Sequence, residues 1–134
     1  MSFYKKFKAS ERHETGGVWL DYGDSGKILV ARAGGGNRKY IREIEKLSRK
    51  YRRQLQLDML PEPTARKLFI EIFARSIVLG WEGVTNEAGE PMACTPENVV
   101  KLFTDLPDLF RDVQEQAGNL ALFREEIDEE DAKN

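Results

Sequence analysis

The segment from Thr64 to Leu79 constrains the fold most, because as a helix it is apolar on nearly every side. Pro61 and Pro63 break the chain before it, Thr64 is suited to cap its first turn, and Gly80 is suited to end it. Its large apolar residues are Leu68, Phe69, Ile70, Ile72, Phe73, Ile77 and Val78. Such a helix needs neighbours all round, so we expect it to be the central, most buried element.

Two elements are expected before this helix. Residues 18–22 alternate between apolar and polar positions, and residues 27–31 follow after a turn flanked by glycines, which predicts a β-hairpin. Asn37 can then cap a helix whose apolar residues recur at helical spacing as far as Leu55. The other face of this helix is almost purely basic.

After Gly80, the sequence predicts a connecting segment followed by two helices. Residues 81–94 are expected to form a short extended or hairpin segment, and Thr95 with Pro96 begins a short helix that runs to about Phe103. A longer helix is predicted from Pro107 to about Glu126, with Gly118 as a weak point that costs about 1 kcal/mol relative to alanine. The predicted fold class is therefore α+β, a mostly helical single domain with an N-terminal β-hairpin.

Length and composition indicate one small domain. With 134 residues and 33% charged side chains, we expect a flexible arm at residues 1–15, a globular domain at 16–127 and an acidic disordered tail at 128–134. No apolar run reaches the roughly 18 residues that a membrane span needs, and the N-terminus lacks the apolar core of a secretory signal. Cys94 is the single cysteine, which agrees with a reducing cytoplasm.

The net charge of −2 hides a strong asymmetry. Residues 32–53 hold nine basic and two acidic residues, whereas residues 105–134 hold ten acidic and three basic residues. The two regions should attract one another, within one molecule or between neighbours, and self-association is therefore plausible. The alternative is that both are simply solvated helix faces.

Motifs that resemble catalytic sites fail on inspection, and we expect no enzyme activity and no cofactor. Residues 23–26 spell Gly-Asp-Ser-Gly, as around a protease serine, but His13 is the single histidine and lies in the expected arm. Residues 34–36 are three glycines without the Gly-Lys-Ser/Thr of a nucleotide loop. One histidine and one cysteine exclude an ordinary zinc site.

Three sequence blocks, taken in order, resemble the tail assembly chaperones of long-tailed bacteriophages and prophages. They are Val18-Trp19-Leu20-Asp21, then Arg32-Ala33-Gly34 with Asn37 and Tyr40, then Trp81 through Leu109. The resemblance spans roughly residues 17–125. It implies a non-catalytic protein that binds the tape measure protein, keeps it soluble, and recruits tail tube subunits in the host cytoplasm. It also implies that the chain is absent from the mature virion.

Candidate contacts follow from this resemblance and from the predicted elements. A tape measure helix exposes apolar stripes until the tube covers it, so a reversible apolar contact is needed. The candidate residues are Trp81, Val84, Pro91 and Met92 on the connector, Leu122 and Phe123 near the chain's end, and a charged face of Arg42, Lys46, Arg49 and Arg53. Trp81 and Phe123 are also suited to the core, whereas Pro91 and Met92 are expected beside an exposed turn.

Other functions stay open at this point. The basic helix at residues 38–53 would suit a nucleic-acid-binding phage protein, although its tyrosines fall on or near the apolar stripe and the pI is 5.6. The chain would also suit a structural head-tail connector or tail-terminator subunit, or a phage factor directed at a host protein.

Overall fold

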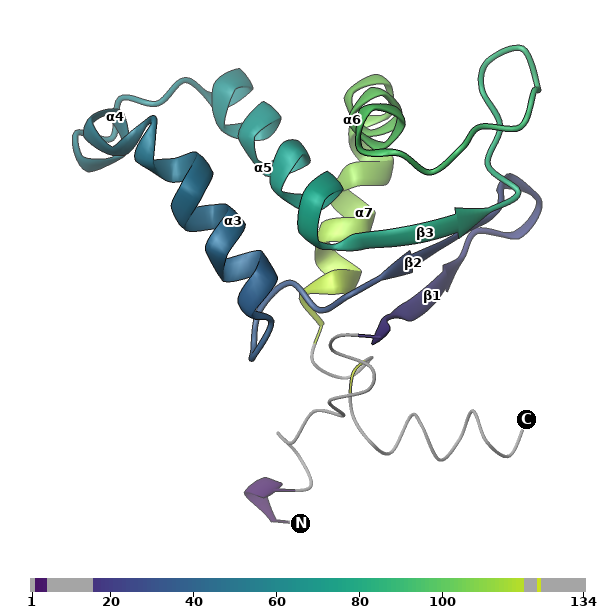
Figure 1. The fold of residues 1–134 in the computed structure, drawn as a ribbon, viewed down its shortest axis with the longest axis horizontal. Coiled ribbons are helices and arrows are strands. Elements are labelled where there is room, and N and C mark those ends of the chain that lie inside the picture. The colour runs from purple at the N-terminus through teal and green to yellow at the C-terminus, as the bar shows by residue number, and fades with distance from the viewer. Residues whose placement is uncertain (1, 5–15, 120–122, 124–134) are drawn as a thin grey trace.

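The computed structural model describes residues 2–4, 16–119 and 123 (Figure 1). Residues 5–15, the predicted acidic tail at 128–134 and the candidate contact Leu122 lie outside the described residues. The described elements are β1 (Val18–Asp21), a 3₁₀ turn (Gly23–Ser25), β2 (Lys27–Val30), α3 (Arg38–Arg49), α4 (Arg52–Gln56), α5 (Glu62–Ser76), β3 (Val78–Glu82), α6 (Pro96–Asp105) and α7 (Pro107–Ala117). The predicted α+β class is confirmed.

The sheet has the strand order β1-β2-β3, with both pairs antiparallel. The predicted hairpin of β1 and β2 is confirmed, with Val18 opposite Val30 and Asp21 opposite Lys27. Gly26 closes the turn with a φ of +116°, and a Cβ atom there would lie 2.7 Å from the carbonyl oxygen of Glu82. Glycine is therefore required where the hairpin turn meets β3.

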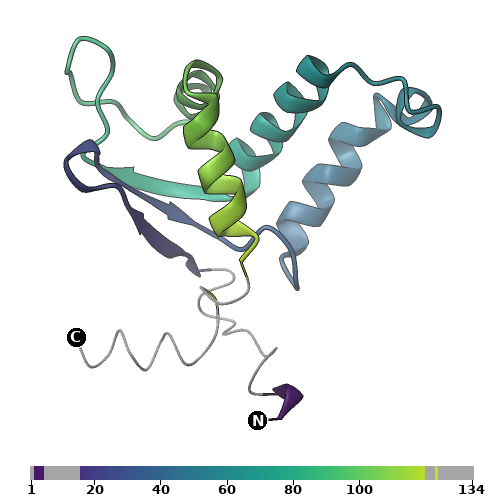
Figure 2. The same ribbon diagram turned by 180° about the vertical axis from the view of Figure 1, so that it is seen from behind.

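A single core joins the sheet to α5, α6 and α7, while α3 lies on the outer side of α5 (Figures 1 and 2). Four aromatic rings in a row connect the helices: Tyr40 of α3 meets Phe73 of α5, which meets Phe110 of α7, which meets Phe103 of α6. The centroid distances along this row are 6.1, 5.4 and 5.3 Å. The prediction of a central, buried α5 is confirmed, with six of its residues buried.

The predicted bounds of α5 were wrong at both ends. The helix begins at Glu62 with Pro61 as its N-cap, so Thr64 lies inside the first turns and does not cap it. Prolines are tolerated there because the first helical N–H groups have no intrahelical partner. The helix ends at Ser76 rather than near Leu79, because Val78–Glu82 forms the third strand, in which Val78 pairs with Val30 of β2.

The basic segment is two helices and not one. A tight turn separates α3 from α4, with the Tyr51 N–H bonded to the Ser48 carbonyl at 3.0 Å. No residue of α3 or α4 is fully buried, although Tyr40 packs against Phe73 at the start of α3. Arg53 therefore lies on α4, whereas Arg42, Lys46 and Arg49 lie on α3.

The predicted final helix is also shorter than expected. It ends at Ala117, and Gly118 is its C-cap rather than a kink within a longer helix. The N–H of Ala33 donates to the carbonyl of Ala117 at 2.8 Å, which ties this helix end to the connection between β2 and α3.

Candidate functional site

A hairpin loop between β3 and α6 projects from the end of the sheet (Figure 1). Thr85 and Pro91 form its one isolated bridge among the described residues, and the Met92 N–H donates to the Val84 carbonyl at 3.0 Å. The Asn86 side-chain oxygen accepts the N–H groups of Ala88 at 2.9 Å and Glu90 at 3.0 Å. These bonds give the loop a defined shape although most of its residues are exposed.

The loop is anchored to the core through Trp81. Its side chain is half-buried against the core, and its indole N–H donates to the Met92 carbonyl at 2.7 Å. Met92 is half-buried and Pro91 is exposed, as expected for residues beside a turn. Trp81 is therefore better placed to hold the loop than to contact a partner directly.

Two of the candidate contacts are buried in the structure. Val84 is 8% exposed and Phe123 is fully buried, and Phe123 belongs to the core cluster. Phe123 therefore fills the interior of the domain, whereas Val84, although nearly buried, also lines a hollow on the surface. Phe123 is thus a core residue, which was the alternative that the sequence left open.

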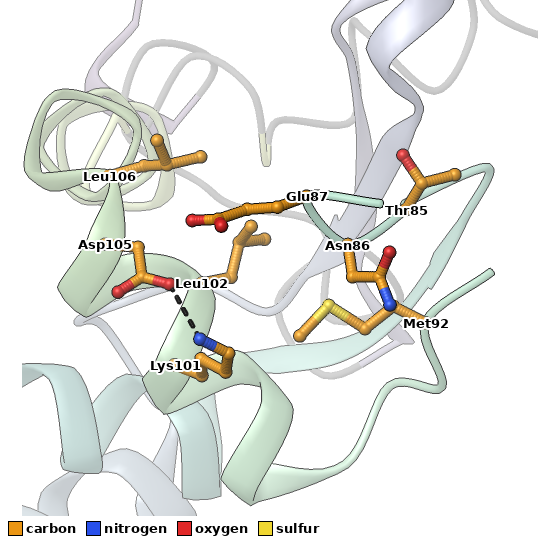
Figure 3. A pocket seen from close by; sticks show the side chains of 8 residues that line it. All are labelled: Thr85, Asn86, Glu87, Met92, Lys101, Leu102, Asp105 and Leu106. Carbon is orange, nitrogen blue, oxygen red and sulfur yellow. Dashed lines mark hydrogen bonds and ion pairs between the residues drawn. The ribbon is translucent and has the colours of Figure 1, made fainter. Parts of the chain in front are cut away.

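Met92 faces a groove between the loop and the C-terminal half of α6 (Figure 3). We call this hollow the loop groove; its lining residues are Thr85, Asn86, Glu87, Met92, Lys101, Leu102, Asp105 and Leu106. It encloses about 220 Å³, which is smaller than the roughly 300 to 1,000 Å³ of typical small-molecule sites. Its size and its apolar floor of Met92, Leu102 and Leu106 suit a bulky side chain of another protein.

A second hollow shares part of its lining with the loop groove and lies beside the hairpin turn of β1 and β2. Thr85, Leu102 and Leu106 line both hollows, and the second also contains Val84 and Leu109. Tyr22 also lines the second hollow, and its hydroxyl donates to an Asp112 carboxylate oxygen at 2.6 Å. Burial first, and this carboxylate second, raise the pKa of Tyr22, so its hydroxyl stays protonated at neutral pH.

Charged side chains stand at the rim of the loop groove. The Lys101 ammonium lies 3.0 Å from an Asp105 carboxylate oxygen (Figure 3), and this hydrogen bond is the main reason that the pKa of Lys101 is raised. Glu87 adds a smaller effect of the same sign. The rim therefore carries two carboxylates around one ammonium, which favours partners with basic groups beside an apolar anchor.

The predicted charged face is exposed on α3 and α4. Arg42, Lys46, Arg49 and Arg53 all lie on the surface, at the opposite end of the domain from the hairpin loop (Figure 1). The two tyrosines beside them are half-buried, and the Lys50 ammonium lies over the Tyr51 ring at 5.7 Å. The aromatic stacking that single-stranded nucleic acid would use is therefore restricted.

Other chemical features of the described chain are few. Burial raises the pKa of the Cys94 thiol, which keeps it protonated and poorly nucleophilic at neutral pH. Among residues 2–4, 16–119 and 123, no three His, Cys, Asp or Glu side chains are grouped as metal ligands would be. In the same ranges, no helix combines the length and the apolar character that a membrane span needs.

Sequence reasoning missed Leu102 and Leu106, which form the groove with Met92. The available signal was their spacing of four residues, which places them on one helix face, together with the position of Leu106 directly before Pro107. Their closeness to Met92 depends on how the loop folds back toward α6, and no local pattern encodes that.

Comparison of the sequence with models of known protein families gives one match. The model of the YdaY prophage protein family matches residues 35–134, which include α3 to α7, the hairpin loop and the loop groove but not β1 and β2. Searches of the curated proteins and of the solved structures gave no significant match. Because the family match covers well over half of the chain, this protein belongs to the YdaY prophage protein family.

Proposed function

We propose that this prophage protein is a non-catalytic tail assembly chaperone that binds the tape measure protein in the host cytoplasm and helps to recruit tail tube subunits. The observation that carries the proposal is the loop groove, with Met92, Leu102 and Leu106 as an apolar floor and charged groups at its rim. Membership of a prophage family and the resemblance of residues 17–125 to tail assembly chaperones support the same function.

The groove has the properties that transient masking of a long helix requires. An apolar side chain from the helix would sit on Met92 and Leu102, and adjacent turns of the helix would extend toward Leu109 along the second hollow. The groove is small and open to solvent, so each contact would be weak and reversible. Reversibility matters because tail tube subunits must later replace the chaperone.

The test is co-expression with the tape measure protein of the same prophage, followed by a solubility assay and a pull-down. The expected result is a tape measure that is soluble only in complex with this chain, and a finished particle that lacks the chain. A chain that instead remains in purified particles would be a structural connector or tail-terminator subunit, and the proposal would be wrong.

A further inference from the structure

The two halves of the described domain carry opposite net charges. Residues 38–76, which form α3, α4 and α5, hold eleven basic and five acidic residues, a net charge of +6. Residues 77–119 hold two basic and eight acidic residues, a net charge of −6. Because α4 and the hairpin loop lie at opposite ends of the molecule (Figures 1 and 2), the domain is a strong dipole.

The basic end carries an exposed apolar tip, which we define as Leu55, Leu57 and Met59. These side chains are 45%, 58% and 67% exposed, values unusual for residues of this kind in a folded domain. The turn that presents them is fixed, since the Met59 N–H donates to the Gln54 carbonyl at 2.8 Å. Asp58 between them has a φ of +52°, a conformation that aspartate tolerates better than most residues.

Three exposed arginines precede the tip in the chain, one at the end of α3 and two on α4. Arg49, Arg52 and Arg53 are exposed, and no carboxylate of the described residues forms an ion pair with any of them. The tip is therefore an apolar knob beside a basic surface.

The loop groove is the complement of the tip on the same molecule. Its floor of Met92, Leu102 and Leu106 is apolar, and Leu106 is 48% exposed. The carboxylates of Glu87 and Asp105 lie at its edge around the Lys101 ammonium, so these three groups carry a net charge of −1. The groove thus offers an apolar hollow with an acidic rim, whereas the tip offers an apolar knob with a basic rim.

We propose that the tip of one copy docks in the loop groove of a second copy, so that the protein associates head to tail. The two surfaces differ, so the contact is heterologous, and each bound copy still offers one free tip and one free groove. Such a contact grows into open chains unless its rotation closes a ring. Since both patches are small and charged, association should rise with protein concentration and fall with added salt.

The experiment is analytical ultracentrifugation of the purified full chain over a range of concentrations, at low and high salt, with no tail protein present. The wild type is expected to form dimers and larger species at low salt. The tip variant Leu57→Asp with Met59→Asp and the groove variant Leu106→Asp are each expected to stay monomeric. Leu106 is the N-cap of α7 and forms no side-chain cap, so aspartate there suits the fold.

Mixing the two variants gives the decisive result. Each variant keeps the surface that the other lacks, so an equimolar mixture is expected to form a one-to-one dimer and nothing larger. The control Ile41→Asp alters a residue of α3 that is 43% exposed and lies outside the tip, and it should associate like the wild type.

Three results would overturn the proposal: a wild type that is monomeric throughout, a groove variant that still associates, or a mixture that stays monomeric. Binding of an acidic protein or a nucleic acid that needs the tip but not the groove, with no self-association, would assign the tip to that partner instead. Both proposals use the loop groove, so a second copy and the tape measure protein would compete for it. The tip variant separates them, because it should lose self-association and keep binding of the tape measure protein.

Discussion

The indole N–H of Trp81 lies 2.7 Å from the main-chain carbonyl oxygen of Met92, which it holds at the edge of the loop groove. This bond joins β3, where the loop leaves the sheet, to the residue after its last bridge. The half-buried Trp81 side chain thereby connects the loop's shape to the core.

Replacing Trp81 with phenylalanine should loosen this loop without unfolding the domain. The Met92 carbonyl would lose its side-chain donor, which should lower the free energy of unfolding by about 0.5 to 1.5 kcal/mol. Denaturant titration measures the loss. As a matched control, Trp19→Phe alters a tryptophan that is 41% exposed on β1 and should cost less. Equal losses in the two variants would show that the Trp81 bond contributes nothing specific.

Met92→Asp should leave the fold intact and weaken binding of the tape measure protein. Aspartate would place a third carboxylate beside Glu87 and Asp105 and would remove the apolar floor of the groove. The measurements are a pull-down and the circular dichroism of the purified variant. Thr104→Asp adds the same charge on an exposed position of α6 outside the groove, so its binding should match the wild type. Undiminished pull-down by Met92→Asp would remove this residue from the contact.

Loss of the Asn37 cap should destabilise the start of α3. The Asn37 side-chain oxygen accepts the Tyr40 N–H at 3.2 Å, and its amide donates to the Arg32 carbonyl at 2.8 Å. Asn37→Ala should therefore cost about 1 to 2 kcal/mol in thermal or denaturant unfolding. Asn37→Asp keeps the acceptor and loses the donor, so its cost should be smaller. The cap would be energetically unimportant if alanine and aspartate behaved like the wild type.

Local signals were sufficient where the chain's own neighbours decide the structure. Asn37 was predicted as a cap and Thr95 as the start of a helix, and the side chain of each accepts a main-chain N–H three residues later. The β1 and β2 hairpin also followed from its alternation and its glycine-flanked turn. In these cases the stabilising partners are close in sequence, so pattern reasoning finds them.

Prediction from sequence failed where contacts between distant segments of the chain determine the local structure. Val78 and Leu79 fit a helix by sequence, but pairing of Val78 and Gly80 with β2 places both residues in strand β3, where Leu79 lies at the register shift. Met92 was predicted as a contact residue, whereas the groove that it lines with Leu102 and Leu106 was not predicted. Phe123 could fill the core or face a partner until its burial was known. Each of these outcomes depends on segments far apart in the chain meeting in space.

Phe73→Ala should be among the most damaging single changes in the domain. The ring is 2% exposed and meets both Tyr40 and Phe110 edge to face, so its removal leaves a cavity at the junction of three helices. The expected loss is about 3 to 5 kcal/mol, measured by denaturant or thermal unfolding. Phe69→Ala is the matched control on the same helix, where the side chain is 40% exposed, and its loss should be much smaller. Similar losses for the two variants would contradict the central placement of α5.

Alkaline pH should destabilise the domain through Tyr22. Burial and the hydrogen bond to Asp112 raise the pKa of its hydroxyl above the ordinary tyrosine value, so the folded state holds the proton longer than the unfolded state does. The resulting stability is complete below about pH 10 and is lost as the pH rises further. Burial raises the pKa of Tyr40 as well, so part of the alkaline loss belongs to that residue. The measurement is the unfolding free energy of the wild type and of Tyr22→Phe, below and above this pH. The variant should lose less unfolding free energy on going to alkaline pH, and the difference from the wild type is the contribution of Tyr22. Phenolate absorbance gives an independent reading, and a Tyr22 that ionises in the ordinary tyrosine range would contradict the buried contact with Asp112.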